Sequence, residues 1–171
     1  MKLTPLLAAA TLLLITGCGS STPETPQVLV TEDETEVSVE QFAGKVSPIK
    51  NDVDSWLTDW EDATCSSLAV SRGAADCGAL ATAGAFTAQA AYMQLDTLTK
   101  TDAPGYFGQP PAELEDLYQR TLETASATND VADTYLEVEC PDTDECTGAA
   151  FDLATGIENL SSALSEWDPY L

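Results

Sequence analysis

The apolar residues of this chain recur at spacings of three and four, and this spacing restricts the fold more than any other feature. A first segment runs from Ser47 to about Cys65 and carries Ile49, Val53, Trp56, Leu57 and Trp60. Such spacing places these side chains on one face of an α-helix. We expect Ser47 to be its N-cap and Pro48 its first helical residue, where the missing N–H costs nothing.

Three later segments show the same periodicity, and we expect helices over about 74–98, 112–138 and 146–167. The apolar stripe of the segment 74–98 comprises Cys77, Leu80, Gly84, Ala88, Ala91, Leu95 and Leu98. That of 112–138 comprises Leu114, Leu117, Tyr118, Leu122, Ala125, Ala132, Tyr135 and Leu136. That of 146–167 comprises Ala150, Phe151, Ala154, Ile157, Leu160, Leu164 and Trp167. Phe86, Tyr92 and Met93 are expected to broaden the first of these faces. With no convincing strand, the pattern predicts an all-α domain over residues 42–171: an antiparallel four-helix bundle with up-down-up-down topology.

The first seventeen residues have the three parts of an export signal. Lys2 supplies one cation, an apolar run extends from Leu6 to Ile15, and small residues follow it. The run falls well short of the roughly 20 residues that a membrane-spanning helix needs. We therefore expect residues 1–17 to be a cleaved signal peptide.

The end of this signal, Ile15-Thr16-Gly17-Cys18, resembles the lipobox of bacterial lipoprotein precursors. The resemblance covers about twenty residues, and no family is recognised for the folded domain. It implies that the Cys18 thiol takes a diacylglyceryl group, that cleavage makes Cys18 the mature N-terminus, and that fatty acids such as palmitate anchor the chain. Two acyl chains hold a protein stably at a bilayer, whereas one holds it marginally. The expected location is the extracytoplasmic face of the cell membrane or outer membrane; the alternative is an ordinary secretory signal.

Residues 18–41 are polar, acidic and Pro-containing, with few side chains able to build a core. We expect a disordered, flexible and acidic tether whose like charges extend it. Val37 and Val39 alternate with polar residues, so this end of the tether either forms a short strand or docks on the domain.

The acidic composition limits the classes of partner. The whole chain has a formal net charge of −23. Loss of residues 1–17 removes only Lys2, so five Lys and Arg face 29 Asp and Glu, a net charge of 5 minus 29, or −24. Such a surface repels phosphates and disfavours nucleic acid, while basic proteins, peptides and metal ions remain compatible. Adaptation to solubility or high salt explains the acidity equally well.

With Cys18 lipidated, four cysteines remain, Cys65, Cys77, Cys140 and Cys146, and an even number in an exported protein predicts two disulfides. Of the three pairings, sequence proximity favours 65 with 77 and 140 with 146. The predicted topology gathers all four at one end of the bundle, distal from the membrane. The tether, the connection at 106–107 and the C-terminus would share the other end.

Few residues indicate chemistry. The chain has no His, which removes Ser-His, Cys-His and common zinc sites, and we predict no enzyme. Asp142, Asp144 and Glu145 are candidate calcium ligands, against the alternative of a solvated acidic turn. Tyr106 and Phe107 are candidate partner contacts, against the alternative that they fold back and close the end of the bundle.

These features together predict a membrane-anchored extracytoplasmic lipoprotein that binds a protein or peptide partner. No cofactor other than the covalent lipid is expected, and the oligomeric state is not indicated. A phage-encoded lipoprotein that excludes superinfecting phage would share these features, although no residue points to it specifically. The alternatives are an envelope protein that binds calcium or another cation, and a structural spacer of the cell envelope.

Overall fold

A computed structural model describes residues 37–141 and 143–171, and this part of the chain contains helices and no strands. The all-α prediction is thus confirmed. The elements are α1 (Val39–Asp62), α2 (Ser67–Ser71), α3 (Ala75–Leu98), α4 (Glu115–Glu137), α5 (Cys146–Ser165) and a 3₁₀ turn, η1 (Asp168–Tyr170). The predicted signal peptide and residues 18–36 of the predicted tether lie outside the described residues.

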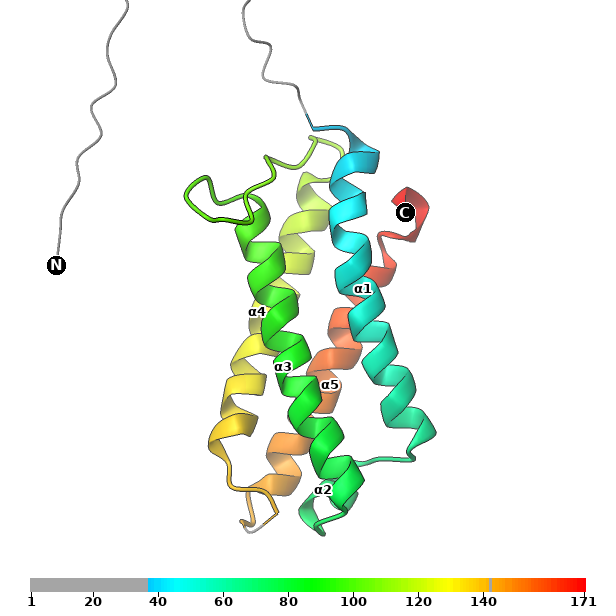
Figure 1. Ribbon diagram of the computed structural model, residues 1–171, viewed down its shortest axis with the longest axis vertical. Helices are drawn as coiled ribbons and strands as arrows, with labels where there is room; N and C mark the ends of the chain where they lie inside the picture. Colours follow the sequence, from blue (N-terminus) through cyan, green and yellow to red (C-terminus); the bar gives the residue numbers. More distant parts are fainter. Residues whose placement is uncertain (1–36, 142) are drawn as a thin grey trace, which may run out of the picture. The chain divides into compact units, whose positions relative to one another are not determined.

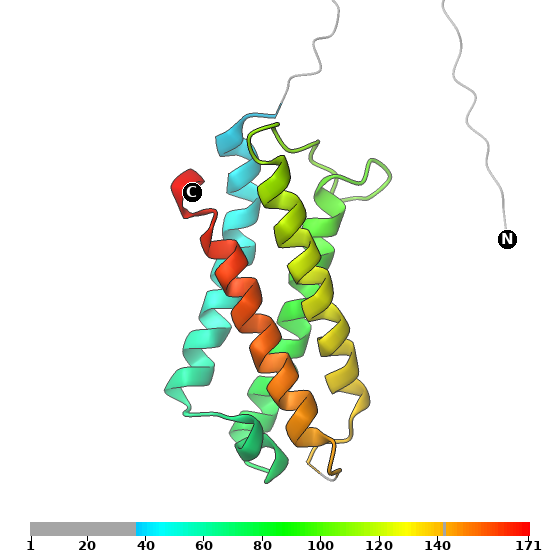
Figure 2. The same cartoon turned by 180° about the vertical axis from the view of Figure 1, so that it is seen from behind.

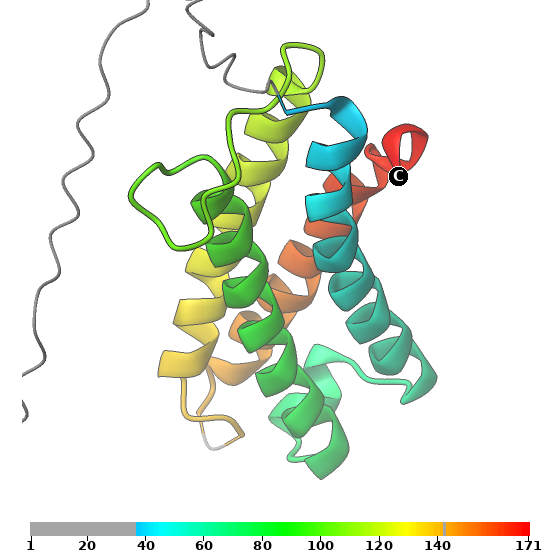
Figure 3. The same ribbon diagram turned by 45° about the horizontal axis from the view of Figure 1, so that its top comes forward.

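The four long helices α1, α3, α4 and α5 lie side by side (Figures 1 and 2). α3 packs extensively on α4, α4 on α5, and α1 contacts both α3 and α5. One end of the domain holds α2 and the connection between α4 and α5. The other holds the start of α1, the connection between α3 and α4, and the C-terminus (Figure 3).

The first helix begins earlier than its sequence predicts, at Val39 rather than Pro48, and Pro48 lies inside it. Ser38 is the N-cap. Its Oγ accepts a hydrogen bond from the backbone N–H of Gln41 at 3.2 Å, and the Gln41 side chain accepts one from the Ser38 N–H at 3.1 Å. This reciprocal capping box satisfies two backbone donors that a helix start otherwise leaves unpaired. The predicted start at Ser47 was therefore wrong, and residues 39–41 belong to the helix rather than to a tether.

An aromatic cluster closes the end of the domain where α1 begins. The fully buried ring of Phe42 has its centroid 5.3 Å from that of Tyr118 and 6.3 Å from those of Phe107 and Trp167. The Trp167 indole N–H donates to the hydroxyl of Thr121 at 2.9 Å, so its buried polar atom is satisfied. The cluster joins α1, α4, the α3–α4 connection and the segment after α5.

Two residues before α1 the chain docks on the domain, one of the two alternatives left open by the sequence. Val37 packs against the core, and a Cβ added to Gly108 would lie 2.6 Å from its Cγ2. Gly108 has a φ of +142°, a conformation that other residues rarely adopt. The backbone N–H groups of Phe107 and Gly108 both donate to the carbonyl of Leu98, at 2.8 and 3.2 Å, and hold this connection in place.

Two residues of the predicted stripes are exposed instead. Leu136 and Phe151 are 37% and 59% exposed, while α4 buries Thr121 and Thr128 and α5 buries Leu153. The two threonine hydroxyls donate to carbonyls one turn earlier in α4, at 2.8 Å each, which makes their burial inexpensive. On α4, these two threonines occupy buried positions that the apolar pattern did not indicate.

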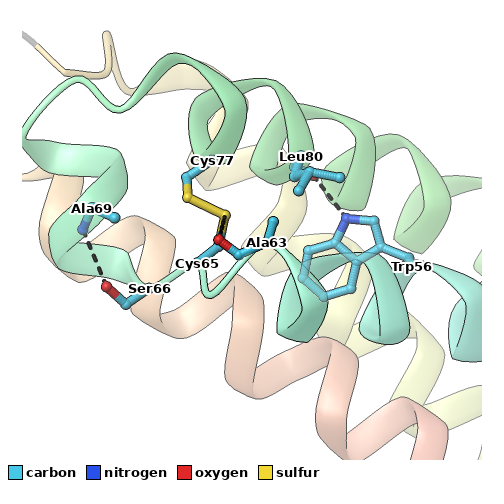
Figure 4. The surroundings of a disulfide bond; sticks show 7 residues. All are labelled: Trp56, Ala63, Cys65, Ser66, Ala69, Cys77 and Leu80. Atoms are coloured by element: carbon cyan, nitrogen blue, oxygen red, sulfur yellow. Dashed lines mark hydrogen bonds between the residues drawn. A yellow bond between two sulfur atoms is a disulfide. The ribbon is translucent and has the colours of Figure 1, made fainter.

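The closest approach between α1 and α3 depends on Gly84. A Cβ on this residue would lie 2.5 Å from Cε2 of the Trp56 indole, so only Gly lets the ring lie against the α3 backbone. The indole N–H donates to the carbonyl of Leu80 at 2.7 Å (Figure 4). Small residues recur along the buried side of α3, which comprises Cys77, Ala81, Gly84, Ala85, Ala88, Ala91, Leu95 and Leu98.

This contact predicts opposite effects for two Gly→Ala substitutions in α3. Gly84→Ala should destabilise the domain: overpacking against a buried rigid ring costs about 1–3 kcal/mol, more than the gain of up to about 1 kcal/mol in helix propensity. Gly78→Ala has no atom within 4 Å of its new Cβ and should be stabilising by up to about 1 kcal/mol. Urea unfolding of both variants tests this; a Gly84→Ala variant as stable as Gly78→Ala would contradict the packing described.

Tyr118 gives the domain a dependence on alkaline pH. Its hydroxyl donates to the carbonyl of Leu95 at 2.6 Å and lies 3.3 Å from the Thr99 hydroxyl. Burial raises the pKa of Tyr118 above its usual 10.0, and burial likewise raises that of Tyr135. These pKa values are higher in the folded than in the unfolded chain. The stability that the two neutral phenols contribute is therefore fully present below pH 10, and it is lost as pH rises through the pKa of the folded state.

We therefore expect the free energy of unfolding to decline above pH 10, and to decline less steeply in Tyr118→Phe. At pH 7 this variant should be less stable by about 1 kcal/mol, the net value of one hydrogen bond. Urea unfolding between pH 7 and 11 measures both effects. The exposed residue Tyr106 provides the control Tyr106→Phe, which should keep the wild-type pH profile. Equal slopes for wild type and Tyr118→Phe would disprove the role of this phenol.

Candidate functional site

A groove with a volume of about 420 Å³ lies between α1 and α3. Trp56 forms part of its wall on α1 and is 5% exposed, whereas Phe86 on α3 is 57% exposed. Other apolar residues that line the groove are Ile49, Leu80, Ala83, Ala90 and Ala91. Polar side chains, among them Ser55, Thr87 and Gln94, also line the groove. The groove thus combines a mixed apolar and polar lining with a large aromatic side chain that is accessible to solvent.

α3 presents a second apolar face beside this groove. The sequence predicted that Phe86 and Met93 widen the buried face, and this was wrong, because they are 57% and 58% exposed. They share a face with Ala79, Ala83 and Ala90, at alternating spacings of four and three. α1, α2, α4 and α5 pack on other parts of α3, and within the part of the chain that the structure describes this face stays largely uncovered.

Two carboxylates stand on the α1 side of the groove. Asp52 and Asp59 line it, are exposed, and lie seven residues apart, which is two helical turns. Neither forms an ion pair with a Lys or Arg of the described residues. Four of the five Lys and Arg side chains in the described residues are engaged elsewhere, in the Lys50–Asp54, Lys50–Asp168, Lys100–Asp96 and Arg120–Glu166 pairs and with Lys45 over the Phe107 ring. Arg72, which follows α2, does not line the groove.

The neighbouring carboxylate Asp54 is used differently. It binds Lys50 at 2.6 Å and accepts a hydrogen bond from the Ser161 hydroxyl at 2.7 Å, which joins α1 to α5. The hydrogen bond that Lys50 donates to Asp54 raises the pKa of Lys50, so this cation stays charged and paired with Asp54 and Asp168. Asp52 and Asp59, in contrast, leave the groove with an uncompensated negative side.

The groove walls are held at fixed positions near one end. The Trp56 ring stacks on Trp60 with centroids 5.2 Å apart and an interplanar angle of 23°. Beyond them, the Cys65–Cys77 disulfide, with an S–S distance of 2.07 Å, ties the segment after α1 to the first turn of α3 (Figure 4). A wall fixed in this way loses little conformational entropy when a ligand enters the groove.

The second disulfide, Cys140–Cys146, has an S–S distance of 2.06 Å and ties the connection between α4 and α5 to the start of α5. This connection lies at the same end of the domain as α2 (Figure 1). The two disulfides are the pairings that sequence proximity favours. A second hollow of about 450 Å³ lies nearby, between the start of α3 and the end of α4, and is lined by small and uncharged residues such as Gly78, Thr82 and Val138.

The two candidate partner contacts in the α3–α4 connection have different environments. Tyr106 is 44% exposed, whereas Phe107 is half-buried in the aromatic cluster, with the Lys45 Nζ 4.7 Å from its ring centroid. Phe107 thus takes the alternative that the sequence left open and folds back onto the core. The two residues do not form one exposed aromatic surface.

The other candidate site residues lie apart from the groove or outside the described residues. Asp144 and Glu145 are exposed, and Asp142 is not among the residues described. In residues 37–141 and 143–171, no three or more His, Cys, Asp or Glu side chains are grouped to hold a metal ion. Cys18, the predicted lipid-attachment residue, also lies outside that range. Within the range, no helix has the length and apolar character to cross a membrane.

Comparisons with known proteins leave the groove to be interpreted from its own geometry. No protein-family model matches this chain, and neither a curated protein nor a solved structure matches it.

Proposed function

We propose that this protein is a lipid-anchored, extracytoplasmic binding module whose α1–α3 groove receives a protein or peptide partner. The exposure of Phe86 in the lining of a groove that carries both apolar and polar side chains is the observation that carries this proposal. Exposed apolar surface rimmed by polar residues is typical of interaction sites. The groove offers carboxylates, hydroxyls and apolar side chains, and we assign it no catalytic step and no cofactor.

The anchor in this proposal is Cys18, with two or more acyl chains in the cell membrane or outer membrane. Its support is the sequence Ile15-Thr16-Gly17-Cys18 at the end of an apolar run. Residues 19–36 would then connect the lipid to α1, and their acidic side chains would favour an extended connection. The groove would be presented to molecules on the extracytoplasmic side of that membrane.

We further propose that the domain is an antiparallel four-helix bundle with up-down-up-down topology, in which α2 is an insertion between the first two long helices. Packing of each long helix on its sequence neighbours, together with the contact of α5 with α1, supports this topology. In such a bundle the groove between α1 and α3 is a seam between two neighbouring helices, a place where bundles commonly build ligand sites.

The anchor is tested by substitution of the lipidated cysteine. Cys18→Ser should abolish labelling by a palmitate analogue and move the protein from the membrane fraction to the soluble extracytoplasmic fraction, because no acyl chain can attach. A Cys65→Ser/Cys77→Ser double variant removes two other cysteines, which form a disulfide, and should keep the label. Continued labelling of Cys18→Ser would disprove the proposed anchor.

The binding function is tested by photo-crosslinking in intact cells. A photoreactive phenylalanine analogue at position 86 should crosslink to a partner that mass spectrometry identifies, because this side chain lies at the groove. Position 151 is the matched control: Phe151 on α5 is 59% exposed and does not line the groove. The same adducts from both positions, or none from position 86, would contradict a binding function for the groove.

A further inference from the structure

We infer that the groove receives a cationic amphipathic α-helix, whose apolar face packs on Phe86, Ala83 and Ala90 while its Lys or Arg side chains pair with Asp52 and Asp59. This inference rests on the proposed function, because it names the chemistry of the partner for the same groove.

The charge of the partner follows from the charge of the rim. Asp52 and Asp59 are the charged residues that line the groove, and within the described part of the chain neither has a basic partner. A ligand with basic side chains gains attraction at both carboxylates and is steered by the net charge of the whole chain, −23. An acidic ligand is repelled at the same two positions.

The backbone conformation of the partner follows from the walls of the groove. Both walls are helices whose backbone groups bond within the helix, and the described residues offer no strand edge to which an extended peptide could add. The Trp56 indole N–H, a typical donor to Pro-rich ligands, is already committed to the carbonyl of Leu80. A helix satisfies its own backbone groups and needs none from the groove.

The spacing of the groove residues also matches a helix. Asp52 and Asp59 are separated by a rise of about 10.5 Å along α1, the distance covered by seven residues of a second, nearly parallel or antiparallel helix. On α3, Ala83 and Ala90 are likewise seven residues apart, with Phe86 between them. Small residues flanking a large one let a neighbouring helix approach closely while the aromatic ring fills a gap between its side chains.

The same charges argue against the two occupants that the chain itself could supply. A second copy would bring another acidic rim and another large negative net charge toward the groove. The segment before α1 is acidic too, with Glu24, Glu32, Asp33, Glu34 and Glu36 and no Lys or Arg after Lys2. A separate basic partner is therefore the occupant that electrostatics favours.

Binding of designed peptides to the purified, lipidated protein in mild detergent tests this inference. The probe is a dye-labelled helical peptide of Leu and Ala with Lys at seven-residue intervals beside the apolar face. Its matched control carries Glu in place of each Lys. Fluorescence anisotropy should show saturable binding of the Lys peptide that weakens as salt rises, with the Glu peptide at least about tenfold weaker.

Paired variants separate the groove from the overall charge. Asp52→Asn/Asp59→Asn should lower the affinity for the Lys peptide several-fold. The control Glu123→Gln/Asp130→Asn removes two exposed carboxylates at the same spacing on α4 and should leave this affinity unchanged. Phe86→Ser should raise the Kd by about tenfold, as loss of an aromatic anchor commonly does. Phe151→Ser removes an equally exposed ring from α5 and should leave the Kd unchanged.

Four results would overturn the inference: no saturable binding of the Lys peptide, equal affinity for the Lys and Glu peptides, equal effects of the two carboxylate pairs, or a self-association of the protein that Phe86→Ser abolishes. The last would assign the groove to a second copy. If position 86 crosslinks to an identified partner in cells but the Lys peptide does not bind, the partner has another chemistry and the binding function stands. If the peptide binds but no partner is found in cells, the proposed function fails while the chemistry of the groove stands.

Discussion

The contact between Trp56 and Gly84 determines how α1 and α3 lie against each other. The indole occupies the space that a Cβ would take, and its N–H is bonded to the Leu80 carbonyl, so the ring has one position along α3. Trp56 also lines the groove, so the same contact fixes the position of one part of its wall. A fold stability of only about 5–15 kcal/mol is typical of domains, and one such contact is a sizeable part of it.

Periodicity predicted the four long helices because a helix that packs on a core repeats its apolar residues every three or four positions. It failed where the determinant was local. The start of α1 is set by the hydrogen bonds between Ser38 and Gln41, a Ser-x-x-Gln pattern that is legible in the sequence and outweighs the preference of Pro48 for a first turn. The five residues of α2 are too few to show a period.

The groove could not be predicted in the same way. Spacing shows which residues share a face of a helix, but not which faces a neighbouring helix covers. α3 is apolar on nearly every side, so the exposed face with Phe86 and Met93 reads like the buried face with Ala81 and Ala85. The sequence signal that was available is that α3 carries more apolar residues than one buried face requires. It indicates an extra contact surface, but its position required the packing of the other helices.

The two disulfides join cysteines that are close in sequence, with separations of 12 and 6 residues. In an unfolded chain, short loops close at a lower entropic cost than long ones, so these pairings are also the most frequent chance encounters among Cys65, Cys77, Cys140 and Cys146. The other two pairings would each close loops spanning much of the domain. Formation of these two disulfides would therefore not require the helices to assemble first, and this protein should depend little on disulfide isomerisation to reach its folded state.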